Sequence, residues 1–197
     1  MTGAAGRVGR ALARAAADAG FDVAIHVRSE GDDAEAAAGE VRGRGRKAVI
    51  LPCDLRKESA VVALVGEAEA ELGAITLLVN AAAAFEPDRF GDMNRATWDL
   101  HMETNLRAPL VLAQAFARRL PADRDGLIVN VVDAHPGEGF SHALSQAALE
   151  RAGALLADRV GPRLTVRTLS AAEGAAPAAR AFGALLAAAL PGSGGHA

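Results

Sequence analysis

Short apolar runs alternate along this chain with longer stretches in which alanine is mixed with charged residues. Five runs have the length of strands, at 21–26, 48–51, 75–79, 126–132 and 164–169. None of them alternates strictly between apolar and polar residues, which is typical of strands that are buried on both faces. The stretches in between favour helices, at 10–19, 32–46, 59–72, 96–120, 141–160 and 177–190. Strands that alternate with helices predict a parallel sheet covered by helices on both faces.

The order of these elements predicts a doubly wound α/β fold in three layers. Right-handed crossovers produce this arrangement, and they place a ligand site at the carboxyl ends of the strands. We expect Ser59 to cap the helix over 59–72 and Gly73 to end it. No linker or repeat divides the chain, so residues 1–190 form one predicted domain, and the Gly-rich residues 191–197 are a predicted disordered tail.

Composition narrows the possible functions. A net charge of −3 gives no basic footprint for nucleic acid or for an anionic membrane. The single cysteine, Cys53, cannot form an internal disulfide, which favours a reducing cytoplasm. We find neither an apolar run of transmembrane length nor the pattern of a signal peptide. The five histidines show no metal-ligand spacing, so no metal site is predicted, and the chain contains no tyrosine.

A turn rich in small residues, Thr2-Gly3-Ala4-Ala5-Gly6-Arg7-Val8-Gly9, precedes the first predicted helix. Glycines let a backbone approach a diphosphate, and the free N–H groups of a helix start favour the anion. The dinucleotide-binding fingerprint places such a turn between a strand and a helix, and here the sequence begins inside the motif. Taken alone, the pattern also fits a flexible start before an ordinary helix.

Several strand ends together resemble the short-chain dehydrogenase/reductases, a Rossmann-like family, and within them the NADPH-dependent pteridine-reductase-like branch. The turn at 2–9 resembles that of the branch, in which an arginine replaces the middle glycine. Asn80-Ala81-Ala82 is similar to the Asn-Asn-Ala-Gly motif of the family, with alanines at its second and last positions. The resemblance implies NADP(H) as cofactor, held by Gly3, Arg7, Val8, Gly9, Arg28, Ser29, Asp54, Leu55, Asn80, Ala81 and Ala82.

The predicted choice between the two nicotinamide cofactors rests on charge. A 2′-phosphate needs fixed positive charge and hydrogen-bond donors, and Arg7, Arg28 and Ser29 carry both. No carboxylate ends the strand over 21–26 to accept from a ribose 2′-hydroxyl, so NADPH is preferred over NADH. Asp54 and Leu55 resemble the pair that holds the adenine ring. Arg28 could also be a solvated strand-end residue, and Asp54 a turn cap.

The downstream half resembles the family's proton-relay set with two replacements. Asn105 matches the asparagine that holds a water, and Asp133 stands where pteridine reductases have an aspartate in place of the catalytic serine. The family's Tyr-x-x-x-Lys pair is replaced by His142 and Gln146. A histidine with a pKa near 6.5 can act as a general acid, and Asp133 could hold it. The alternative is an ordinary polar histidine at a helix start.

Both ends depart from the family pattern. The family's central strand precedes the turn, and without it the strands at 21–26 and 48–51 are expected to lose their pairing with those at 75–79 and 127–132. Either the polypeptide begins upstream of Met1, or the sheet closes in another way, such as with a partner's strand. Near the other end, Ser170-Ala171 replaces the usual Pro-Gly, and the last strand is missing.

These observations are compatible with three functional hypotheses. One hypothesis is an NADPH-dependent reductase of a pterin or another small carbonyl or imine substrate, impaired by the changes at His142 and Gln146. The alternative is a non-catalytic NADPH- or ligand-binding member that acts as a partner subunit of an active paralogue. A remnant without activity is a third. A homo-oligomer, or a heteromer with a related full-length chain, is expected.

Overall fold

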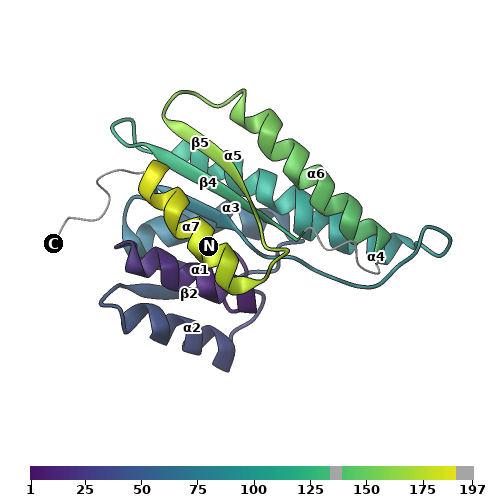
Figure 1. Cartoon of the computed structure of the whole chain (residues 1–197), viewed down its shortest axis with the longest axis horizontal. Coiled ribbons are helices and arrows are strands. Elements are labelled where there is room, and N and C mark those ends of the chain that lie inside the picture. The colour runs from purple at the N-terminus through teal and green to yellow at the C-terminus, as the bar shows by residue number, and fades with distance from the viewer. Residues whose placement is uncertain (134–138, 190–197) are drawn as a thin grey trace.

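The computed structural model describes residues 1–133 and 139–189 and has the predicted Rossmann-like α/β architecture, with parallel strands between layers of helices (Figure 1). The strands are β1 (Val23–Val27), β2 (Ala48–Pro52), β3 (Leu77–Asn80), β4 (Gly126–Val132) and β5 (Leu164–Ser170). The helices are α1 (Arg7–Asp18), α2 (Asp32–Arg42), α3 (Glu58–Leu72), α4 (Arg95–His101), the π-helical η1 (Met102–Arg107), α5 (Ala108–Arg119), α6 (Phe140–Ala157) and α7 (Ala175–Ala189).

The strands form two parallel sheets, one of β1 and β2 and the other in the order β3-β4-β5. Met1 and Thr2 lie between them. Thr2 N–H donates to the Val79 carbonyl, and the Met1 carbonyl accepts from His26 N–H. These two residues therefore touch both sheets, but the rest of the space between β1 and β3 has no strand among the described residues. The prediction that β1 and β2 do not pair with β3 and β4 is confirmed.

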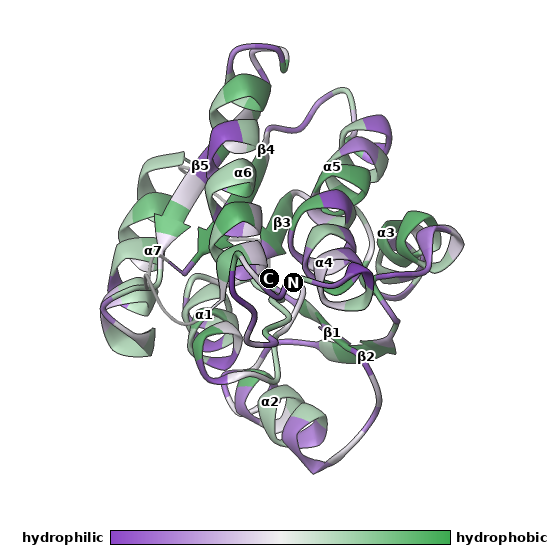
Figure 2. Ribbon diagram, turned by 90° about the vertical axis from the view of Figure 1, so that its right-hand side faces the viewer, coloured by the Kyte–Doolittle hydropathy of each residue, from purple (hydrophilic) through white to green (hydrophobic). Residues whose placement is uncertain are grey.

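Small aliphatic side chains form two buried clusters, as an alanine-rich chain requires. One cluster joins α1, α2 and α7 to β1, with Leu12, Ile25 and Phe182 at its centre. The other packs α3 and α5 against the sheet, around Leu112 and Phe116. Figure 2 shows β1, β2 and β3 in green between helices that carry both green and purple residues, whereas β5 is pale and purple over part of its length.

Several predicted boundaries were wrong for local reasons. Ser59 is not the cap of α3, because the helix starts at Glu58 after Lys57 and has no side-chain cap. The helix over 96–120 is interrupted by the π-helical turn η1, and it ends at Arg119. The helix over 32–46 ends at Arg42, where the Gly-Arg repeat begins. Gly73 ends α3 at a φ of 82°, as predicted.

Other boundaries differ by a few residues. The strand over 126–132 matches β4, whereas the strand over 75–79 is β3 and starts at Leu77. The last helix starts at Ala175 instead of Pro177, directly after Gly174. The predicted tail at 191–197 lies outside the described residues. Of the helices in residues 1–133 and 139–189, none is long and apolar enough to cross a bilayer.

Candidate functional site

A cleft of about 990 Å³ opens at the carboxyl ends of β1, β2 and β3. Much of the predicted cofactor set lines it, namely Gly3, Arg28, Ser29, Asp54, Leu55, Ala81 and Ala82. Four predicted residues are not part of this lining: Arg7, Val8, Gly9 and Asn80. The cleft therefore lies where the topology of a parallel sheet places ligands.

The turn before α1 is packed too closely for side chains at two of its glycines. Gly3 has a φ of +63°, and a Cβ there would lie 2.7 Å from the Ala82 Cα. A Cβ on Gly9 would lie 2.2 Å from the Gly3 carbonyl oxygen. Arg10 N–H donates to Gly6 at the helix start, so the amides of the three preceding residues have no helical acceptor. The backbone N–H groups of Val8 and Gly9 can thus donate hydrogen bonds to an anion.

Two hydrogen bonds of one side chain attach this turn to the end of β3. The Thr2 hydroxyl oxygen accepts from the backbone N–H groups of Ala81 and Ala82, each at 3.1 Å. The Asn80 side chain turns the other way and donates to the Asn130 side-chain oxygen at 2.9 Å. Asn80 therefore braces β3 against β4, and its predicted contact with the cofactor is not supported by its side-chain position.

Both signs of charge are present at the predicted 2′-phosphate position. Arg28 and Ser29 are exposed in the cleft, and Glu30, Asp32 and Asp33 line it as well. The prediction from the strand end overlooked these three carboxylates because they lie beyond the strand, in the turn and at the start of α2. Arg7 is exposed on α1 outside this lining, with its guanidinium near Gly174.

Asp54 makes an ion pair that the sequence did not reveal. Its carboxylate lies 2.8 Å from the Arg56 guanidinium and also accepts from Arg56 N–H. The hydrogen bonds from Arg56 hold the pKa of Asp54 at about 2, so this carboxylate is ionised. Asp54 thus caps the turn after β2, which was the open alternative, and it brings a second cation, Arg56, to the cleft.

A buried histidine ties the turn to the strand ends. His26 Nδ1 accepts from Gly3 N–H at 3.3 Å, and Nε2 lies 2.9 Å from the Cys53 carbonyl oxygen, to which it donates. Burial lowers the pKa of His26, which keeps the ring neutral and suits this one-donor, one-acceptor arrangement. In the sequence, His26 ends a predicted strand shortly before Arg28 and Ser29, and nothing there indicates these two hydrogen bonds.

Asn105 is the residue predicted for the proton relay, and that role stays a prediction. It is buried in the π-helical turn η1, a local widening that is frequent at functional sites. Its side-chain oxygen accepts from Ala84 N–H at 2.7 Å. Its amide nitrogen donates to the Ala84 carbonyl at 3.0 Å and to the Ser145 hydroxyl at 3.1 Å. These bonds leave no freedom to exchange the oxygen and nitrogen of the amide.

His142 lies directly beside this asparagine. Its Nδ1 is 3.1 Å from the Ala84 carbonyl oxygen and 3.4 Å from the Asn105 amide nitrogen. Because the Asn105 amide hydrogens have two other acceptors, Nδ1 carries a proton and donates to Ala84. Nε2 makes no hydrogen bond to the described residues, and His142 is buried just outside the lining of the cleft. Phe85 flanks the imidazole edge-on, with ring centroids 5.2 Å apart.

A second histidine, His101, packs edge-to-face against His142, with ring centroids 5.7 Å apart. Its Nε2 accepts from Glu86 N–H at 3.0 Å, and its Nδ1 is buried without a partner among the described residues. Burial lowers the pKa of His101, and the charge of His142 lowers it further. The lowered pKa favours the neutral form of His101.

The remaining two predicted catalytic residues are joined through the backbone. The Gln146 side-chain oxygen accepts from Asp133 N–H at 3.0 Å, and Gln146 is buried on α6. The Asp133 side chain is exposed at the end of β4, and its pairing with His142 stays a prediction. No group of three potential metal ligands occurs in residues 1–133 and 139–189.

Comparison with known proteins places this geometry in a family. The short chain dehydrogenase family profile matches residues 1–148. The 3-oxoacyl-[acyl-carrier-protein] reductase FabG of Staphylococcus epidermidis is 27% identical over 131 residues, which cover 66% of this chain and 54% of that protein. The chain thus spans about half the length of this curated relative.

Two solved structures from other bacteria are similar over most of the chain. FolM Alternative dihydrofolate reductase 1 from Brucella suis, in complex with NADP, is 37% identical with a TM-score of 0.79, covering 86% of this chain and 72% of that one. A short chain dehydrogenase from Burkholderia cenocepacia, also in complex with NADP, is 28% identical with a TM-score of 0.82, covering 94% and 86%.

Proposed function

This chain belongs to the short-chain dehydrogenase/reductase family, and from that premise we propose that it binds NADP(H) in the cleft at the strand ends. We further propose NADPH-dependent reduction of a pterin or another small carbonyl or imine substrate, at a rate lowered by the loss of the family's tyrosine and lysine. The position of His142 carries the proposal, because it packs against Phe85, which lines the cleft, and its Nε2 makes no hydrogen bond to the described residues.

The residues of the cleft fit the cofactor. The close packing at Gly3 and Gly9 and the free amides at the start of α1 suit a diphosphate. Arg28 and Ser29 suit a 2′-phosphate, and relatives that share 37% and 28% of their residues are solved with NADP. Glu30, Asp32 and Asp33 oppose a second phosphate charge, so we expect the preference for NADPH over NADH to be moderate.

In this proposal, residues of this chain supply the proton that the reaction consumes. NADPH, when bound, supplies a hydride. Protonated His142 donates from Nε2 to the substrate oxygen or nitrogen, while the Ala84 carbonyl holds Nδ1–H and so fixes the ring. Asn105 and Ser145 position the loop and helix that carry these groups. Reduction of the double bond thus consumes one hydride and one proton.

The proposed preference for a pterin rests on the similarity of this chain to FolM and on the side chain of Phe85. FolM, described as an alternative dihydrofolate reductase, is 37% identical to this chain. Phe85 lines the cleft beside His142 and offers an aromatic edge or face to a flat ring. Asp133 stands at the position of the pteridine-branch aspartate, for which we propose a role in proton delivery to the ring.

A non-catalytic partner subunit is the second candidate. Gln146 is neutral, and its side-chain oxygen is occupied by Asp133 N–H, so it does not replace the family's ammonium. In that role the chain would bind NADPH or another small ligand, within an oligomer that contains an active relative. We place either form in the cytoplasm and expect no contact with nucleic acid or membrane.

Turnover separates the two candidates. NADPH oxidation is measured with a dihydropterin and with a quinone, for the purified chain and for the His142→Phe variant. Turnover that the substitution removes supports the reductase. NADPH binding without turnover in both proteins supports the non-catalytic subunit, and turnover that survives His142→Phe contradicts the assigned acid.

A further inference from the structure

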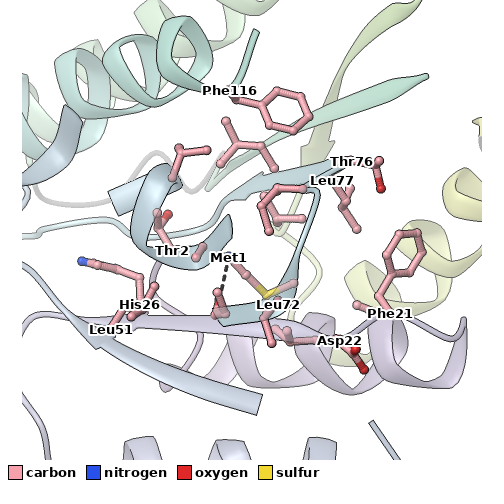
Figure 3. A pocket seen from close by; sticks show the side chains of 18 of the residues that line it. Met1, Thr2, Phe21, Asp22, His26, Leu51, Leu72, Thr76, Leu77 and Phe116 are labelled. Carbon is pink, nitrogen blue, oxygen red and sulfur yellow. Dashed lines mark hydrogen bonds between the residues drawn. The ribbon is translucent and has the colours of Figure 1, made fainter. Parts of the chain in front are cut away.

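Asp88, on the loop between β3 and α4, carries a buried carboxylate, and only 7% of the residue is exposed. It is the one buried Asp or Glu in the part of the chain that the structure describes. The residue borders neither the cofactor cleft nor the largely apolar cavity of about 690 Å³ that Figure 3 shows beside Met1 and Leu77. Because a carboxylate loses solvation when it is buried, its partners must compensate this cost.

This carboxylate caps the first turn of α6 at Ser141, 53 residues further along the chain. One of its oxygens accepts from Ser141 N–H at 3.0 Å and the other from the Ser141 hydroxyl, while the Asp88 carbonyl accepts from Phe140 N–H at 3.2 Å. Gly139, the N-cap residue, has no side chain to bind these amides. Burial alone would raise the pKa of Asp88, but the hydrogen bonds from Ser141 outweigh it and lower the pKa, so the carboxylate is ionised.

His142 follows Ser141 directly, in the same first turn of α6. Its Nδ1 lies 3.1 Å from the carbonyl oxygen of Ala84, which stands four residues before Asp88. The loop therefore contacts the helix start twice, at the imidazole through Ala84 and at the preceding backbone through Asp88. Helix ends fray readily, so the distance between the ring and Ala84 depends on what holds this first turn in place.

The loop between these two contacts is fixed to the neighbouring helices. Ala84 N–H donates to the Asn105 side chain in η1 at 2.7 Å, and Glu86 N–H donates to His101 Nε2 in α4 at 3.0 Å. Alternate residues of the loop thus bond in turn to η1, α4 and α6, at the spacing of an extended segment. Asp88 completes this series at α6, and so it ties the start of that helix to the helices that hold Asn105 and His101.

We propose that Asp88 is a positioning residue for His142, which holds the first turn of α6 so that the imidazole stays in the orientation in which Nδ1 donates to Ala84. Asp88 does not line the cofactor cleft, so we expect that NADPH affinity does not depend on it. The expected effect on turnover rests on the proposed function, in which His142 is the acid. The expected effects on the ring and on the helix start do not.

Two substitutions of Asp88 and one control test this role. Asp88→Ala removes both acceptor oxygens, whereas Asp88→Asn keeps one oxygen for the Ser141 N–H and removes the charge. The control is Asp92→Asn in the same loop, whose exposed carboxylate accepts from Arg89 N–H. The nitrogen chemical shifts of the His142 ring, identified by their loss in His142→Phe, report which ring nitrogen carries the proton. Amide hydrogen exchange at Ser141, Tm, kcat and the Kd for NADPH are measured on the same proteins.

Asp88→Ala should lose the preference for the Nδ1–H form of His142 and speed exchange at Ser141 by roughly tenfold or more. It should lower kcat by roughly tenfold, because the acid is displaced, and leave the Kd for NADPH unchanged. Asp88→Asn should recover part of each effect, and Asp92→Asn should match the unsubstituted chain.

Unchanged ring shifts and exchange in folded Asp88→Ala would overturn the proposal, as would a lower Tm with unchanged ring shifts and kcat. If Asp88→Ala does not fold, Ser141→Ala removes the hydroxyl bond alone and should change the ring shifts in the same direction, and no change would overturn the proposal. A chain without turnover in any form would contradict the proposed function, whereas the ring shifts and the exchange would still decide the positioning role.

Discussion

The Ala84 carbonyl oxygen lies 3.1 Å from His142 Nδ1, and this contact assigns the proton of a neutral imidazole to Nδ1. Asn105 reinforces the choice, since its amide nitrogen donates to the same carbonyl and to Ser145. A histidine held in this way presents Nε2 as donor when charged and as acceptor when neutral. We propose that a histidine held in this orientation takes the place of the family's tyrosine.

Removing the imidazole tests that role. We predict that His142→Phe lowers kcat/KM by roughly a hundredfold or more, the usual loss when a general acid is removed, while NADPH affinity changes little. Steady-state kinetics and a binding titration measure the two quantities. Glu150→Gln, on the exposed side of the same helix, is the matched control and should leave both unchanged. A comparable loss in both variants would assign the effect to folding.

We also predict that the side chain of Asn105 stabilises the folded protein. Asn105→Ala leaves the Ala84 N–H without its acceptor and removes one of two hydrogen bonds from the Ala84 carbonyl and from the Ser145 hydroxyl, at a cost of about 1–3 kcal/mol. Urea unfolding measures this loss. Gln114→Ala on α5 removes an exposed amide and should change the free energy of unfolding by less than about 0.5 kcal/mol. Similar values for both variants would mean that the Asn105 contacts do not stabilise the fold.

Two glycines provide a matched test of the turn. Gly9→Ala places a Cβ 2.2 Å from the Gly3 carbonyl oxygen, so the turn must move and NADPH affinity should fall by roughly tenfold or more. Gly39→Ala, in the exposed part of α2, meets nothing within 4 Å and should stabilise the chain by about 0.5–1 kcal/mol. Binding titrations and thermal unfolding compare the two variants. Unchanged NADPH affinity in Gly9→Ala would argue against a diphosphate site at this turn.

Charge at the cleft sets the predicted cofactor preference. Arg28→Ala should weaken NADPH by roughly ten- to a hundredfold and leave NADH nearly unchanged. Glu30→Gln removes an opposing carboxylate from the same cleft and should strengthen NADPH. Titration of each variant with both cofactors gives the ratios. Equal effects of Arg28→Ala on the two cofactors would contradict the 2′-phosphate assignment.

Stability should fall as the pH is lowered from 8 to 5. Burial lowers the pKa of His26 in the folded state below its usual value near 6.5, so the unfolded chain binds more protons as the pH falls through that value. The Met1 amino group acts in the same sense between its usual value of 8.0 and about 5. Tm measured across this range should decrease, and acetylation of the amino group should remove the part above pH 7. A flat or opposite profile would contradict both assignments.

The sequence was most informative where local chemistry and position agree. The run at 126–132 became β4 without change, and Gly73 ended its helix, because both depend on neighbouring residues. Asn105 and His142 were predicted from a resemblance, and the structure brings them together. The ion pair of Asp54 with Arg56 and the neighbour His101 were missed, since these contacts depend on turn geometry and on packing between elements.

The central claim is that the turn and strand ends form an NADP(H) site, and a fluorescence titration of the purified chain with NADPH, and with NADH as control, tests it most directly. We predict saturable binding that is tighter for NADPH and is weakened by Gly9→Ala but not by Gly39→Ala. Absence of binding by the folded chain, or binding that does not distinguish these variants, would contradict the assignment.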